Sequence, residues 1–77
     1  MIFGTQIKAA RVLAGWSQED LASKAGLGIM TVKRFEASKT EFGTVASLSK
    51  MKKALEEAGI IFIDAGPDGG PGVRLAK

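Results

Sequence analysis

The 77 residues carry a formal net charge of +3 and include neither cysteine nor histidine. This composition excludes disulfides and cysteine zinc sites, removes the usual general base, and is typical of a reducing cytoplasm. We therefore expect one small cytoplasmic domain that is not an enzyme, with no metal or cofactor, and with no membrane span because no apolar run approaches ~20 residues.

The charge is divided unevenly along the chain. Residues 1–53 contain nine basic and four acidic side chains, whereas residues 54–77 contain two basic and four acidic ones. A basic helical segment suits a polyanion such as nucleic acid, although a solvated basic surface would give the same count.

The N-terminal part predicts a first helix. Residues 1–4 are apolar and form either an extended arm or a cover for the core. Thr5 is the predicted N-cap of a helix over residues 6–14, which Gly15 ends in a left-handed conformation. Its apolar stripe comprises Ile7, Ala10, Leu13 and Ala14.

A second helix has a strong local start signal. Ser17 followed by Asp20 is a capping-box pattern. Trp16 and Leu21 flank the cap at the positions of a hydrophobic staple, so we interpret Trp16 as a packing residue. The helix is predicted to end near Ala25.

Gly26 is predicted to turn the chain in the left-handed conformation, and a third helix follows over residues 28–37. Val32 and Phe35 face the core together with Leu27. The outward face of this helix, formed by neighbours four residues apart, comprises Ile29, Met30, Lys33 and Arg34.

After a loop over residues 38–43, a fourth helix is predicted over residues 44–58. Its inner face comprises Val45, Leu48, Met51 and Leu55.

The tail then predicts two short strands, residues 60–63 and 73–75, around a loop rich in glycine and proline. An isolated hairpin is marginal in water, so it must pack on the helices or pair with another chain.

The spacing of the small, turn and apolar positions between Gln18 and Phe35 resembles the helix-turn-helix of the Cro/phage-repressor (Xre-type) family of transcription regulators. The SQEDLA block, Ala22 at the helix crossing, Gly26 at the turn and the following RFEAS carry the resemblance. It covers about residues 6–59 and implies a mainly α bundle of four to five helices, to which the sequence adds a short C-terminal β-hairpin.

The resemblance also implies roles for individual residues. Residues 1–59 would be the helix-turn-helix DNA-binding domain, and residues 60–77 a tail that we expect to dimerise. The residues expected to read DNA bases are Gly28, Ile29, Met30, Lys33 and Arg34. The residues expected to contact phosphates are Gln18, Thr31, Lys39, Thr40 and Lys53. Arg11 and Glu36 match a structural ion pair. The expected dimer interface comprises Ile60, Ile61, Phe62, Ile63, Val73 and Leu75.

Two functional hypotheses follow. The first is a homodimeric repressor that binds double-stranded DNA at a palindromic operator, acts by occupancy and can control its own gene. The second is a protein-interaction module, an antitoxin or antiactivator, that docks through Ile29 and Met30 or through the glycine-rich tail. No small-molecule ligand is evident, because the loop over residues 66–72 lacks the Gly-Lys-Ser/Thr ending of a phosphate-binding loop.

Overall fold

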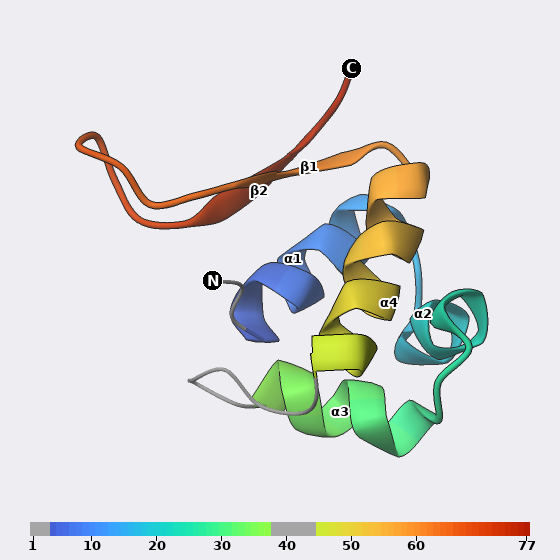
Figure 1. Ribbon diagram of the computed structural model, residues 1–77. Coiled ribbons are helices and arrows are strands. Elements are labelled where there is room, and N and C mark those ends of the chain that lie inside the picture. The colour runs from blue at the N-terminus through green and yellow to red at the C-terminus, as the bar shows by residue number, and fades with distance from the viewer. Residues whose placement is uncertain (1–3, 38–44) are drawn as a thin grey trace.

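The computed structural model describes residues 4–37 and 45–77, which form four α-helices followed by an antiparallel β-hairpin (Figure 1). The helices are α1 (Gly4–Leu13), α2 (Gln18–Ala25), α3 (Ile29–Ala37) and α4 (Val45–Glu57), and the strands are β1 (Ile60–Ile63) and β2 (Gly72–Leu75). The predicted class, a mainly α bundle with a C-terminal hairpin, is confirmed. Of the predicted arm or core cover at residues 1–4, only Gly4 is described, and it is the buried first residue of α1. Residues 1–3, the loop predicted over residues 38–43 and the side chain of Val45 lie outside the described part.

The ends of α1 correct two details of the prediction. The helix begins at Gly4, so Thr5 lies in its first turn and is not the N-cap, because a cap residue has a non-helical conformation. Leu13, predicted to lie in the buried stripe, is the last residue of α1 and 43% exposed. Ile7 and Ala10 are buried as expected, and Gly15 has the predicted positive φ of 76°.

Helix α2 has the predicted cap. The Asp20 N–H donates to Ser17 Oγ at 3.0 Å, and the Ser17 N–H donates back to the Asp20 carboxylate at 2.9 Å. At the other end Gly26 is left-handed, with φ of 69°, and the Leu27 N–H reaches the Ala22 carbonyl at 2.8 Å. Both ends of this short helix are therefore defined by residues within a few positions of it.

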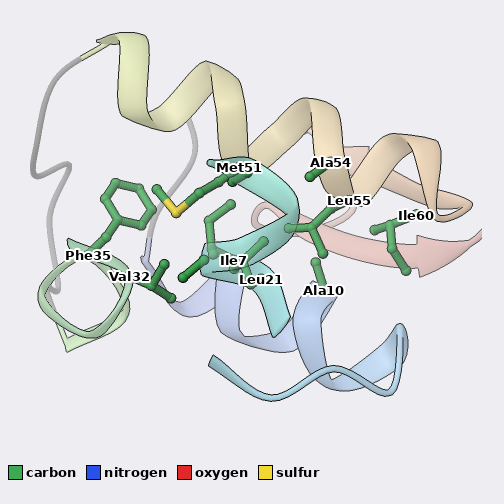
Figure 2. Packing of buried hydrophobic residues seen from close by; sticks show 11 residues of the cluster. Ile7, Ala10, Leu21, Val32, Phe35, Met51, Ala54, Leu55 and Ile60 are labelled. Carbon is green, nitrogen blue, oxygen red and sulfur yellow. The ribbon is translucent and has the colours of Figure 1, made fainter. Parts of the chain in front are cut away.

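A single apolar core joins the four helices and β1 (Figure 2). Its large members from the helices are Ile7 of α1, Leu21 of α2, Val32 and Phe35 of α3, and Met51 and Leu55 of α4. Ala22 is 4% exposed in α2, which packs directly against α3, so the prediction of a small residue at a buried position of this motif is confirmed. Trp16 packs against the edge of the core, in agreement with its interpretation as a packing residue.

The hairpin packs on the helices. Its register places Ile60 opposite Leu75 and Phe62 opposite Val73. Ile60 is buried in the core, and Phe62 and Val73 are half-buried against it. Gln6 of α1, itself buried, donates from Nε2 to the Gly72 carbonyl at 3.2 Å and so ties β2 to α1. The hairpin is thus an integral part of the protomer.

The capping box predicts a pH-dependent stability. The hydrogen bond from the Ser17 backbone is the largest cause that lowers the pKa of Asp20 below its ordinary value of 3.8. The carboxylate therefore stabilises the fold above that ordinary pKa, and this contribution is lost as the pH falls through the lowered value. We expect Asp20→Asn to lower the free energy of unfolding at neutral pH and to match the wild type near pH ~2, as measured by urea unfolding at both pH values.

Glu19→Gln is the matched control for this prediction. It removes a carboxylate from the same first turn of α2 but leaves both capping hydrogen bonds in place. The Asp20→Asn variant should therefore be the less stable of the two at neutral pH. Equal stability of the two variants would contradict the assigned role of Asp20.

Candidate nucleic-acid interface

Helix α3 presents to solvent a basic face that also includes one apolar side chain. Met30, Lys33 and Arg34 are exposed, with Met30 53% exposed. They lie three and four residues apart, which places them on one side of the helix. Val32 and Phe35 lie on the opposite side, within the core. The two cationic side chains thus stand on a helix that is anchored through its other face.

Ile29 does not belong to this exposed face, which corrects the sequence prediction. Its side chain is half-buried and packs against the core. The reason is its position: Ile29 precedes Val32 by three residues and Glu36 by seven, so all three lie on the same side of the helix. The exposed apolar surface of α3 is therefore formed by Met30 rather than by two adjacent apolar side chains.

The N-terminus of α3 is suited to negative charge. Gly28 precedes the helix, is exposed, and accepts the N–H groups of Thr31 and Val32 at its carbonyl, at 3.1 and 3.4 Å. No acidic residue lies in the first turn of this helix, all of which the structure describes. The N–H groups of Ile29 and Met30, at the very start of the helix, lack carbonyl partners within it, and the helix dipole adds partial positive charge there. Thr31, expected to contact a phosphate, is half-buried beside this turn.

The N-terminus of α2 differs from that of α3. Its first turn contains Glu19 and Asp20, and the capping box already uses the Asp20 N–H. The Gln18 side chain, expected to contact a phosphate, donates from Nε2 to Glu36 Oε1 at 3.2 Å. The Gln18 amide therefore helps to hold α3 in place through Glu36, and the Gln18 side chain remains half-exposed.

The predicted ion pair between Arg11 and Glu36 is present and joins α1 to α3. Arg11 Nε donates to Glu36 Oε2 at 2.8 Å, and Nη2 donates to Oε1 at 3.2 Å. The two side chains are 13% and 3% exposed. Arg11 Nη1 also donates to the Trp16 carbonyl at 2.8 Å. Together with Gln18, this network links the first three helices and restricts how α3 can move.

The remaining predicted residues are distributed as follows. Lys53 is exposed on α4, and Lys39 and Thr40 lie outside the described residues. The expected dimer set divides into two groups. Ile60 is buried, and Phe62 and Val73 are half-buried in the protomer. The exposed group comprises Ile61, Ile63 and Leu75.

Two contacts were missed by the sequence prediction, and both involve glutamine. Gln6 immediately precedes Ile7 and lies four residues before Ala10, so helical spacing could have indicated an inward position. The bond from Gln18 to Glu36 joins residues 18 positions apart and had no local signal. Residues 4–37 and 45–77 contain no cluster of metal-ligating side chains, and none of the helices in these ranges is long and apolar enough to cross a membrane.

The ion pair yields a stability prediction. Arg11→Met removes the cation but keeps a long side chain, so the Glu36 carboxylate stays buried without its charged partner. We expect a loss of about 3–5 kcal/mol in the free energy of unfolding, measured by urea unfolding. The double variant Arg11→Met/Glu36→Met should recover a substantial part of this loss, because it removes the unpaired charge. A loss of no more than about 1 kcal/mol in the single variant, as for a surface ion pair, would contradict this.

The comparisons with known proteins agree with this geometry. A helix-turn-helix family model matches residues 7–60, which span the ion pair, the capped α2, the turn at Gly26 and all of α3. A comparison with curated proteins found no match. Because the family match covers well over half of the 77 residues, and because the matched segment has the helix-turn-helix geometry, the chain belongs to the Cro/C1-type (Xre-like) helix-turn-helix family of DNA-binding proteins.

Proposed function

We propose that this protein is a homodimeric, sequence-specific transcription regulator that represses by occupying a palindromic operator. The observation that carries the proposal is the exposed face of α3, where Met30, Lys33 and Arg34 stand on a helix fixed by the core and by the Arg11–Glu36 pair. The family match supports DNA binding by this helix-turn-helix.

The side chains of α3 suit the edges of base pairs in a major groove. Arg34 carries a planar guanidinium that can donate two hydrogen bonds to O6 and N7 of guanine. Lys33 can donate to the same acceptors as a point charge, and Met30 can contact a thymine methyl group. Gly28 precedes α3, and Ile29 is its first residue. Because Ile29 is half-buried against the core, its side chain would hold the start of the helix in place rather than contact a base.

Phosphate contacts would set the register of the protein on DNA. The free N–H groups at the start of α3 are the best-placed donors, since this end carries no acidic residue. Lys53 and the half-exposed Gln18 could add contacts at the sides of the reading helix. For Lys39 and Thr40 the phosphate role remains a prediction from the sequence.

A dimer would place two copies of α3 in successive major grooves on one face of the duplex, ~34 Å apart. The hairpin is the expected dimer element, and it lies at the end of the molecule away from α3 (Figure 1). Repression would then follow from occupancy of the promoter, and a binding site upstream of the protein's own gene would make it autoregulatory.

The test is fluorescence anisotropy with a duplex from upstream of the protein's own gene, beside a scrambled duplex, at two salt concentrations. We expect tight, salt-sensitive binding to the upstream duplex, because phosphate contacts release counterions. Arg34→Ala should weaken binding to it by about 5- to 150-fold, which corresponds to the loss of one bidentate base contact.

Lys8→Ala is the control, because it removes one exposed positive charge from α1 without touching α3. It should change the affinity much less than Arg34→Ala. Equal weakening by both variants would mean that the DNA contact is non-specific. Binding to neither duplex would favour the second hypothesis, a protein-docking role, although the burial of Ile29 leaves Met30 as the exposed apolar side chain of that surface.

A further inference from the structure

A cavity lies where the turn before α2, the C-terminal part of α2 and the end of α4 meet. Its volume is about 330 Å³, which is at the lower end of the range for small-molecule sites. It is lined by Trp16, Lys24, Ala54, Glu57 and Ala58, and we call it the Trp16 cavity. No residue of α3, all of which the structure describes, lines it, so it is separate from the proposed DNA interface.

The uncharged part of this lining is apolar. Trp16 is half-buried, and its ring packs against the edge of the core. Ala54 is buried and Ala58 is exposed, and their short side chains leave space beside the indole. An indole in a concave site offers a flat surface on which an apolar or aromatic group can pack.

The charged part of the lining contains one cation and one anion. The Lys24 ammonium lies 5.9 Å from the centroid of the Trp16 ring, and this cation–π contact holds a flexible side chain beside the cavity. The ion pair found among the described residues joins Arg11 to Glu36. Lys24 and Glu57 therefore line the same cavity without forming an ion pair with each other.

The end of α4 is suited to a positively charged group. Its last turn contains Glu56 and Glu57 and no basic residue. The carbonyl groups at the C-terminus of a helix carry partial negative charge, which adds to that of the two carboxylates. The last turn of α2, by contrast, contains Lys24. One side of the Trp16 cavity therefore favours an ammonium group, and the other favours a carboxylate.

We infer that the Trp16 cavity binds one free α-amino acid with an apolar side chain. The carboxylate of the ligand lies at Lys24, its ammonium group lies at Glu57, and its side chain packs on the indole of Trp16. An amino acid carries both charges on one carbon atom, whereas a peptide separates them at its two ends and exceeds a cavity of this volume. The inference does not rest on the proposed DNA binding.

The pair of lining charges favours a zwitterion over an ion of either sign. A ligand with only a carboxylate would pair with Lys24 but place its charge near Glu57, and a ligand with only an ammonium group would meet the opposite problem. The lining residues come from three segments of the chain, which is why no small-molecule ligand was evident in the sequence.

Trp16 reports on this site directly, because it is the sole tryptophan and the chain has no tyrosine. The probe is L-phenylalanine, titrated while tryptophan fluorescence is excited at a wavelength that phenylalanine does not absorb. We expect a saturable change with a dissociation constant in the millimolar range, because the ligand has few atoms. Phenethylamine and 3-phenylpropionate, which each lack one of the two charges, should bind at least about fivefold more weakly.

Two substitutions assign the charged contacts. Lys24→Gln should bind L-phenylalanine no better than phenethylamine, because the carboxylate no longer meets a cation. Glu57→Gln should bind L-phenylalanine no better than 3-phenylpropionate. The matched control Glu56→Gln removes a carboxylate from the same last turn of α4 but outside the lining, and it should keep the wild-type preference for the zwitterion. Circular dichroism should show that all three variants keep the helical fold.

Several outcomes would overturn the inference: no saturable change with L-phenylalanine up to its solubility limit, equal affinity of the wild type for all three ligands, or a Lys24→Gln variant with the wild-type preference. A Glu56→Gln variant as weak as Glu57→Gln would also overturn it. The three ligands test the wild type without any substitution. Since no DNA is present, a failure of the proposed operator binding would leave this result unchanged.

Discussion

The buried carboxylate of Glu36 is the group on which the arrangement of α1, α2 and α3 depends. It is 3% exposed and accepts hydrogen bonds from both Arg11 and Gln18. A charge placed so deeply is tolerated only when it is paired and hydrogen-bonded. Each of the three helices therefore contributes one group to a single site, and a shift of any of them would leave a buried polar group unsatisfied.

This constraint bears on the proposed reading of DNA, because α3 supplies both Glu36 and the exposed basic face. Arg34 and Lys33 lie two and three residues before Glu36 on the same nine-residue helix. The helix is too short to be stable by itself, so its position comes from the core and from this network. Rigid support of α3 matters for the proposed base contacts, since such contacts depend on where a few side-chain atoms lie in the groove.

The two ends of the molecule have different chemistry. The α3 end is basic and has a helix start without acidic residues. The strands of the hairpin expose the apolar side chains of Ile61, Ile63 and Leu75, and β1 has its other face against the core. The basic face of α3 and the exposed apolar side chains of the hairpin therefore lie at separate places on the protomer (Figure 1).

Local signals in the sequence determined both ends of α2 and the turn after it. The Ser17–Asp20 capping box and the left-handed Gly26 depend on residues within one helical turn, so they could be predicted and are confirmed. The apolar spacing likewise identified most of the core, and the resemblance identified the ion pair. Tertiary structure decided the rest. Ile29 packs inward because the start of α3 meets the core, and Leu13 is exposed because α1 ends there. Ile60 is buried because the hairpin folds back onto α4 and onto α1, and α1 lies far from it in the chain, a contact that periodicity does not encode.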